Sequence, residues 1–307
     1  MSIIADQVTR NYGAQRALDN VSFEIPAGRI TGFLGPNGAG KSTMMKIITG
    51  YIPATTGRVT IDGIEVGPGN VDLKRRIGYL PENNPLYPDM YVREYLAFVA
   101  SLYLPAGERT AAVKRITDLT GLTPESGKKI GELSKGYRQR VGLAQALIHD
   151  PDVLILDEAT TGLDPNQIVG IRNLISEAGK QKTVMISTHI MQEVEAICDR
   201  VIIIDRGRIV ANDDKENIYR LMKQTTGSII VEFDGEPAPE SLMGIAGAGK
   251  VSRGRNREYI IEPAGESDIR QALFAWAVAN SLAVLSLRSR ENNLEEVFRH
   301  LTGGTTV

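Results

Sequence analysis

Short, predominantly apolar runs recur through the first two thirds of the chain, separated by longer segments of mixed character. They occupy residues 30–34, 153–156, 184–186 and 201–204. Continuous apolar runs of this length are typical of strands buried on both faces, as in a parallel sheet covered by helices. Arg206-Gly207 follows the last run and predicts a tight hairpin to another short strand. The pattern therefore predicts an α/β fold for this part of the chain.

Between about residues 84 and 150 the apolar positions follow a helical period instead. Within 94–104 they recur near every 3.6 residues, at Leu96, Val99, Ala100 and Tyr103. Thr110 is expected to cap a second helix over 111–119, and Ser134 a third that extends to Leu147. We therefore expect a helical subdomain inserted between the strands.

From residue 228 the pattern changes again. Strands are predicted at 229–233, 259–261 and 283–287, and helices at 240–245, 268–279 and 294–301. This arrangement predicts a small α+β domain built on a split β-α-β unit. We therefore divide the chain into a large domain at 1–223, a linker at 224–227 and an accessory domain at 228–307. For the accessory domain we expect regulation or dimer contacts rather than chemistry.

The composition is that of an ordinary globular protein, with 42% hydrophobic and 23% charged residues in a chain of 307. A formal net charge of −2 gives no electrostatic basis for binding nucleic acid, so no such partner is expected. Cys198 is the only cysteine, which excludes an intrachain disulfide. The first residues lack the features of a signal peptide, and no apolar run reaches the roughly 18–20 residues of a membrane helix. We expect a cytoplasmic protein that reaches a membrane only through a partner.

The most specific chemical signal is a phosphate-binding loop after the first apolar run. It fits the pattern G-x-x-x-x-G-K-[ST] in full, with Gly35, Pro36, Asn37, Gly38, Ala39, Gly40, Lys41, Ser42 and Thr43. The glycines allow backbone N–H groups to surround an anion. Lys41 is expected to reach the β- and γ-phosphates, and the Ser42 hydroxyl to bind Mg²⁺. A predicted helix follows, so the phosphates would lie at a helix N-terminus.

The chain contains a second, incomplete copy of this pattern at residues 244–250. It ends in Gly249-Lys250, but Val251 follows, so the hydroxyl that would bind Mg²⁺ is missing. No apolar strand leads into it. We interpret this segment as an ordinary turn.

Two carboxylates follow the apolar run at 153–156. Asp157 and Glu158 are expected at the carboxyl end of a strand, where parallel α/β sheets bind their ligands. Asp157 is expected to hold Mg²⁺, directly or through water, and Glu158 to polarise the attacking water. The alternative is a pair of solvated loop residues, which the nearby phosphate loop disfavours.

Residues 133–140 lie between these motifs and read Leu-Ser-Lys-Gly-Tyr-Arg-Gln-Arg, which resembles the signature of ATP-binding cassette (ABC) ATPases. Residues 162–164 are similar to the family's D-loop, and 187–189 to its switch-histidine loop. The order and spacing of these elements match the family over residues 1 to about 220. The resemblance implies an ABC-type P-loop ATPase core that binds ATP and Mg²⁺.

The resemblance also implies roles for single residues. Tyr12, placed before the first strands, is expected to stack on adenine. Ser134 and Gly136 are expected to contact the γ-phosphate of an ATP bound to a second chain. His189 is expected to sense or stabilise the γ-phosphate, which makes it a catalytic residue together with Lys41 and Glu158. Glu82 replaces the family's usual glutamine and is expected to be a metal ligand, because Mg²⁺ prefers oxygen.

One chain carries one phosphate loop and one signature, which in this family meet only across two chains placed head to tail. We therefore expect two ATP molecules to be sandwiched between this chain and a second copy or a related ATPase subunit. The helical subdomain is expected to accept a helix of an integral-membrane permease, which would hold the protein on the inner face of the cell membrane. The alternative for the aromatic segment 84–91 is plain core and turn.

Three functions remain in competition. The first is the ATPase subunit of an exporter-type membrane transporter; residues 78–87, 89–92 and 294–298 are similar to the ATP-binding protein associated with gliding motility. The second is a soluble ABC ATPase acting on ribosomes or DNA, disfavoured because the chain has neither two cassettes nor a long coiled-coil insertion. The third is a non-catalytic nucleotide-binding module, which the intact catalytic residues argue against.

Overall fold

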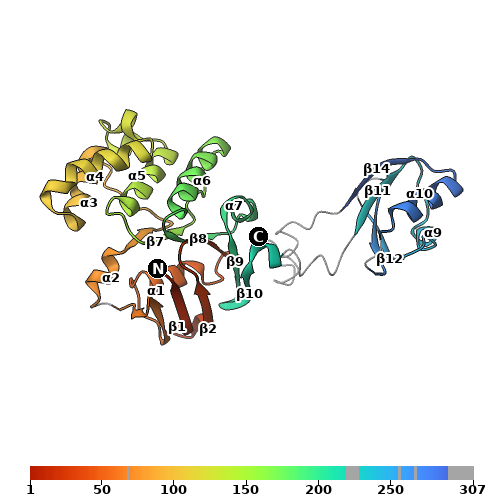
Figure 1. Cartoon of the computed structure of the whole chain (residues 1–307), viewed down its shortest axis with the longest axis horizontal. Helices are drawn as coiled ribbons and strands as arrows, with labels where there is room; N and C mark the ends of the chain where they lie inside the picture. Colours follow the sequence, from red (N-terminus) through yellow and green to blue (C-terminus); the bar gives the residue numbers. More distant parts are fainter. Residues whose placement is uncertain (68, 219–227, 255–256, 266–267, 290–307) are drawn as a thin grey trace. The chain divides into compact units, whose positions relative to one another are not determined.

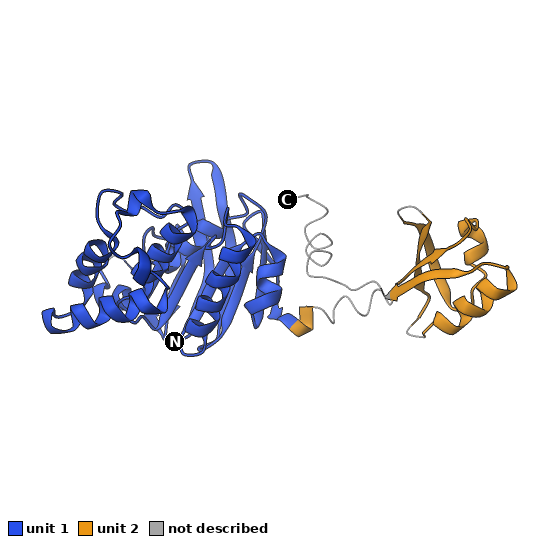
Figure 2. Ribbon diagram, turned by 90° about the horizontal axis from the view of Figure 1, so that it is seen from above, with its two compact units in different colours: residues 1–215, 299–307 blue, residues 216–298 orange. Residues whose placement is uncertain are grey.

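The computed structural model describes residues 1–67, 69–218, 228–254, 257–265 and 268–289. They form two compact units, the first ending at Lys215 and the second beginning at Glu216 (Figure 2). The predicted linker at 224–227 and the predicted last helix at 294–301 lie outside the described residues. The assignment of domains at 1–223 and 228–307 stays a prediction.

A six-stranded sheet forms the centre of the first unit, in the order β10-β9-β3-β8-β7-β6. Its strands are β3 (Ile30–Leu34), β6 (Ile77–Leu80), β7 (Val153–Asp157), β8 (Thr183–Thr188), β9 (Arg200–Asp205) and β10 (Arg208–Asp214). All are parallel except β10, which pairs antiparallel with β9 after the predicted hairpin. β3, β7 and β8 are buried along their whole length, which confirms the strands predicted from continuous apolar runs.

A second, antiparallel sheet has the order β2-β1-β4-β5. It consists of β1 (Ile3–Tyr12), β2 (Gln15–Ile25), β4 (Thr56–Ile61) and β5 (Ile64–Glu65). Helix α1 (Lys41–Ile48) packs against β2 and β4 of this sheet and against β7 and β8 of the central sheet. One hydrophobic core, which includes Phe23, Phe33 and Met44, therefore joins the two sheets around the helix that carries Lys41.

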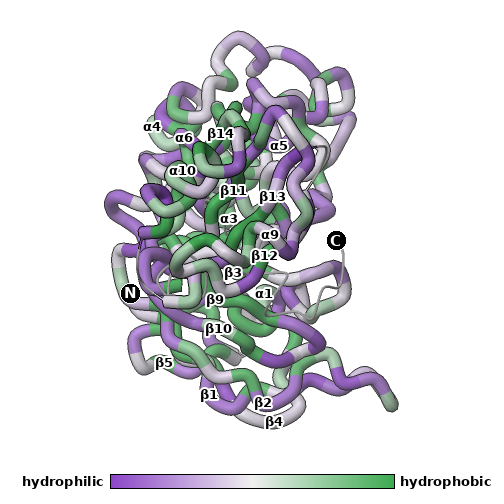
Figure 3. Tube along the Cα trace, turned by 90° about the vertical axis from the view of Figure 1, so that its right-hand side faces the viewer, coloured by the Kyte–Doolittle hydropathy of each residue, from purple (hydrophilic) through white to green (hydrophobic). Residues whose placement is uncertain are grey.

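The remaining helices of the first unit are α2 (Val71–Arg75), α3 (Val92–Tyr103), α4 (Ala106–Leu119), α5 (Lys135–Leu147), α6 (Pro165–Gly179) and α7 (Met191–Ile197), with 3₁₀ turns at Thr123–Glu125 and Ile130–Glu132. α3, α4 and α5 group together on one side of the unit and form the predicted helical subdomain (Figure 1). The central strands β3 and β9 are hydrophobic, and hydrophilic segments lie toward the periphery (Figure 3). No helix within the described residues is long and apolar enough to cross a membrane.

The start of α4 differs from the prediction. The helix begins at Ala106 rather than after Thr110, because Pro105 provides the extended residue that precedes it. The Arg109 side chain also donates to Leu104 O (2.9 Å), which stabilises this earlier turn. Thr110 therefore lies inside the helix, and the prediction that it caps the helix was wrong.

The described part of the second unit contains a four-stranded antiparallel sheet and the helices α9 and α10. Along the chain its elements are β11 (Ile229–Phe233), α9 (Pro239–Leu242), β12 (Ala248–Arg253), β13 (Glu258–Pro263), α10 (Arg270–Ala279) and β14 (Val284–Ser289). The strand order β12-β13-β11-β14 makes this a ferredoxin-like β-α-β-β-α-β arrangement. The predicted α+β class is confirmed, but β12 was missed. The residues Gly249-Lys250 lie on that strand and not in a turn.

Candidate active site

The phosphate loop connects β3 to α1, and two of its glycines are required by close backbone contacts. A Cβ atom on Gly35 would lie 2.5 Å from Ile204 O, and one on Gly40 would lie 2.6 Å from Ala17 O. Gly40 also has a φ of 108°, a conformation that strains any residue with a side chain. The loop is thus held tightly against β9 and β2, with its C-terminal end at the start of α1.

Lys41 is buried at the first position of α1, and its side chain turns back into the loop. Its Nζ donates to Gly35 O (2.8 Å) and Pro36 O (3.3 Å) and lies 3.6 Å from Glu158 Oε1. Burial lowers the pKa of Lys41, and the nearby carboxylates of Glu158 and Asp157 oppose this shift. An ammonium group held this way is placed to receive a phosphate without moving far from the loop.

Asp157, the last residue of β7, has an unsatisfied buried oxygen. The residue is 1% exposed, and its Oδ1 has no hydrogen-bond partner within the described residues. Burial raises the pKa of Asp157, and the neighbouring Ser42 and Ser187 hydroxyls and Lys41 oppose the shift. Such a carboxylate next to the Ser42 hydroxyl suits Mg²⁺, which is commonly bound through one or two protein oxygens together with substrate phosphates. The site therefore fits the ion that the phosphate loop implies.

We predict that Asp157→Asn raises the Mg²⁺ concentration needed for half-maximal ATP turnover by about 10-fold or more, because an amide is a poorer ligand than a carboxylate.

Without ligand, the Asp157→Asn variant should not be less stable than the parent protein. Because the pKa of Asp157 is raised on folding, the folded form holds its proton more tightly, and this group's contribution to stability falls as pH rises. Mg²⁺ titrations test the first expectation. Thermal melts from about pH 3, below the usual carboxylate pKa values near 4, up to about pH 8 test the second. Asp152→Asn, at an exposed carboxylate directly before β7, is the control.

Glu158 follows β7 in a left-handed conformation that is uncommon for a residue with a side chain, with φ 53°. Its backbone N–H donates to Ser187 O (3.0 Å), and its carboxylate accepts a bond from Thr161 Oγ1 (2.8 Å). His189 Nδ1 lies 2.9 Å from Glu158 Oε2 and 3.1 Å from Oε1. Because an ionised carboxylate only accepts hydrogen bonds, Nδ1 carries the proton and Nε2 is left for another partner. Backbone strain of this kind concentrates at functional sites.

The structure thus brings Lys41, Asp157, Glu158 and His189 to one edge of the central sheet, at the ends of β3, β7 and β8. Thr161 belongs to the same cluster but was not identified from the sequence. Its hydroxyl orients the Glu158 carboxylate from three residues away along the chain. A threonine after an acidic strand end carries no distinctive signal, so only the fold reveals this contact.

Tyr12 is the last residue of β1. The expectation that it precedes the first strands was wrong. The first strand extends to Tyr12 because Gly13 adopts a left-handed turn that pairs Tyr12 with Gln15 on β2. Tyr12 is 45% exposed, and the Arg10 guanidinium lies 4.8 Å from the centroid of its ring. One face of the ring is therefore covered by Arg10, and a flat base can stack on the exposed part.

We predict that Tyr12→Ala weakens ATP binding by about 1–3 kcal/mol, which is the usual value of stacking a base on an aromatic ring. Tyr12→Phe should bind ATP almost as tightly as the parent protein, because it keeps the ring. Fluorescent-nucleotide titration measures both. Equal affinities of the alanine variant and the parent would remove Tyr12 from the site.

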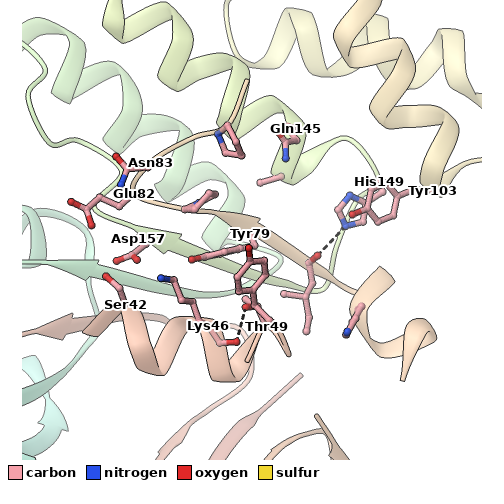
Figure 4. Close-up of a pocket in the computed structure, with 16 residues that line it drawn as sticks. Ser42, Lys46, Thr49, Tyr79, Glu82, Asn83, Tyr103, Gln145, His149 and Asp157 are labelled. Carbon is pink, nitrogen blue, oxygen red and sulfur yellow. Dashed lines mark hydrogen bonds between the residues drawn. The ribbon is translucent and has the colours of Figure 1, made fainter. Parts of the chain in front are cut away.

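A cavity of about 690 Å³ extends from the phosphate loop toward the helical subdomain. Ser42, Asp157 and Glu82 lie at one end, and His149 stacks on Tyr103 at the other (Figure 4). Glu82 comes from the loop after β6 and is exposed. Its position beside Asp157 and Ser42 is compatible with the predicted contact to a metal ion.

The signature residues lie at the start of α5. Ser134 caps this helix, as predicted, and its Oγ accepts a bond from Tyr137 N (3.4 Å). Gly136 is buried against Gln167 of α6, where a Cβ atom would lie 2.4 Å from Gln167 Cδ. Among the described residues, no hydrogen bond or ion pair joins Ser134 or Gly136 to the phosphate loop. Their contact with the γ-phosphate of an ATP on a second chain stays a prediction.

Comparisons with known proteins agree with this geometry. Residues 18–161 match the family model described as ABC transporter. The chain is 34% identical to the linearmycin resistance ATP-binding protein LnrL of Bacillus subtilis strain 168, with 98% of each chain covered. It is also 34% identical to the Nod factor export ATP-binding protein I of Rhizobium johnstonii, over 96% of this chain and 93% of that one.

Among solved structures, a bacterial ABC transporter cassette determined as a dimer superposes with a TM-score of 0.64 and 28% identity, over 69% of this chain and 98% of that one. The same cassette is also known in a post-hydrolysis state bound to ADP and Pi. The family match lies on the unit that contains the phosphate loop, and the full-length similarity extends it to the whole chain. The protein therefore belongs to the ATP-binding subunits of ABC transporters and is an ATPase.

Proposed function

We propose that this protein powers an exporter-type membrane transporter through ATP-driven, head-to-tail dimerisation with a second copy. The observation that supports this proposal is the separation of two half-sites within one chain. Lys41, Asp157, Glu158 and His189 gather at the phosphate loop. Ser134 begins a different helix, and among the described residues no hydrogen bond or ion pair joins it to that loop. Each half-site is complete only when a second chain supplies the other.

Within one such site the residues divide the chemistry. Lys41 balances the charge of the β- and γ-phosphates, and the Glu158 carboxylate orients and polarises the attacking water. His189 holds Glu158 through Nδ1 and presents Nε2 toward the γ-phosphate. Ser42 and Asp157, with Glu82 nearby, would hold Mg²⁺, which supplies further charge neutralisation when bound. The partner's signature helix adds its N-terminus to the γ-phosphate, so ATP favours the closed dimer and hydrolysis releases it.

The permease is the proposed membrane anchor, and the proposed location is the inner face of the cell membrane. Outward transport is favoured because relatives are named for Nod factor export and linearmycin resistance. The role in gliding motility rests on short sequence similarities, one of them outside the described residues, and stays a prediction. A regulatory or dimer-contact role for the C-terminal unit also stays a prediction.

Crosslinking in native membranes, followed by detergent extraction and mass spectrometry of the captured proteins, tests the proposed partner. We expect one polytopic membrane protein to be the main partner of the tagged chain. The Lys41→Met variant, which should not bind ATP, is the control: proteins that it captures equally well are captured independently of nucleotide. Capture of ribosomal or DNA-bound proteins alone would contradict the transporter and leave the ATPase chemistry in place.

A further inference from the structure

Glu193 is a buried carboxylate that no step described above uses. It lies on α7 and is 3% exposed. Its Oε1 accepts a hydrogen bond from Thr160 Oγ1 and its Oε2 accepts one from Thr188 Oγ1 (2.8 Å). No ion pair reaches it from the residues that the structure describes. Two hydroxyl groups, and no cation, therefore satisfy this buried acid.

The two threonines lie on different loops of the site. Thr160 follows Glu158 by two residues in the loop after β7, and Thr188 directly precedes His189 at the end of β8. Thr188 Oγ1 also accepts a bond from Ile190 N (3.0 Å), so its hydroxyl is both donor and acceptor. The Glu193 carboxylate thus ties the loop that carries Glu158 to the loop that carries His189.

This tie has an energetic consequence. A buried carboxylate that loses a hydrogen bond pays a desolvation penalty, so neither hydroxyl separates easily from Glu193. Glu158 itself sits in a left-handed conformation, which persists only where surrounding contacts hold it. The 2.9 Å contact between His189 Nδ1 and Glu158 depends on both loops keeping their relative positions.

We propose that Glu193 is a positioning residue for ATP hydrolysis, which fixes the Glu158–His189 pair by clamping Thr160 and Thr188 with one carboxylate. The inference rests on the proposed roles of Glu158 and His189. Among the described residues no hydrogen bond joins Glu193 to Glu158 or His189, so it acts through the two threonines. Its contribution lies in the geometry of the pair rather than in its own charge.

The hydrogen-bond pattern shows which substitution should preserve the clamp. In Glu193→Gln, the amide oxygen can accept the hydrogen bond from Thr188 Oγ1. Thr188 is the better donor of the two threonines because its hydroxyl oxygen already accepts a bond from Ile190 N. The amide NH₂ can donate to Thr160, whose hydroxyl oxygen has free lone pairs. Glu193→Ala removes both contacts. Thr160→Val removes one contact and keeps the acid, so it tests the clamp even if Glu193→Ala folds poorly.

The test is steady-state ATP turnover with nucleotide titrations and thermal melts for Glu193→Ala, Glu193→Gln and Thr160→Val. We expect kcat to fall about 10- to 100-fold in Glu193→Ala and Thr160→Val, because small displacements of catalytic groups cause losses of this size. The affinity for ATP should stay within about two-fold, and the glutamine variant should recover most of the turnover. Gln192→Ala, exposed on the same helix, is the matched control.

Three results would overturn the inference. The first is an unchanged kcat in both Glu193→Ala and Thr160→Val. The second is a loss of turnover in Glu193→Gln as large as that in Glu193→Ala. The third is a fall in ATP affinity large enough to account for the lost turnover. Glu158→Gln is measured in parallel. If it still hydrolyses ATP, the proposed function fails; if it is inactive while Glu193→Ala is normal, only the clamp fails.

Discussion

Glu158→Gln will lower ATP turnover by about 10²- to 10⁴-fold while ATP binding remains intact, because the variant loses only the general base. Glutamine has the shape of glutamate, and its amide oxygen can still accept the bond from Thr161. It cannot polarise the attacking water as a carboxylate does. Since the proposed mechanism uses hydrolysis to open the closed dimer, the variant should also accumulate a dimer when ATP is added.

Turnover is measured by phosphate release, and dimer formation by light scattering with and without ATP. Glu177→Gln, which removes an exposed carboxylate on α6, serves as the control and should behave like the parent. A turnover rate in Glu158→Gln equal to that of the parent would exclude Glu158 as the residue that activates water.

Lys41→Met should abolish ATP-dependent stabilisation as well as turnover. The ammonium of Lys41 is buried between two loop carbonyls and Glu158, and methionine would leave this point without a positive charge. A ligand present at about 1,000 times its dissociation constant stabilises a folded protein by about 4 kcal/mol. We therefore expect ATP to raise the melting temperature of the parent protein and to leave that of the variant unchanged.

The chain supplies its own matched control for this experiment. Lys250→Met changes the lysine of the incomplete second motif, which lies on strand β12 and has no role in the site. It should keep both turnover and the ATP-dependent shift. A normal shift in Lys41→Met, or a lost shift in Lys250→Met, would contradict the assignment of the phosphate loop.

The sequence predicted the elements that carry the chemistry because each has a strong local signal. β3, β7 and β8 are buried on both faces and therefore read as unbroken apolar runs, and the polar residues at their ends stand out. The glycines of the phosphate loop are fixed by backbone contacts that few other residues tolerate. Local sequence patterns were sufficient to predict these strands and the phosphate loop.

Elements whose identity depends on distant partners were not predicted. β12 reads Ala-Gly-Lys-Val-Ser-Arg, and only its pairing with β13 makes it a strand. The start of α4 was missed for a local reason instead, because Pro105 and Arg109 stabilise a turn that begins the helix earlier than its apolar pattern indicates. The Glu193 carboxylate binds Thr160, which lies 33 positions earlier in the chain. No periodicity or spacing in the sequence marks such a contact.

Mixing two inactive variants tests the composite dimer most directly. Lys41→Met lacks a working phosphate loop but keeps its signature, and Ser134→Glu keeps the loop but places a negative charge where the γ-phosphate should lie. Ser134 is exposed, so this change costs little more than a helix cap, about 1 kcal/mol. In a head-to-tail dimer of the two variants, one site is intact and the other is doubly broken. Equal mixing should therefore restore about a quarter of the parent turnover, because half the dimers are mixed and each has one of two sites. Turnover that stays at the level of the separate variants would contradict a site shared between two chains.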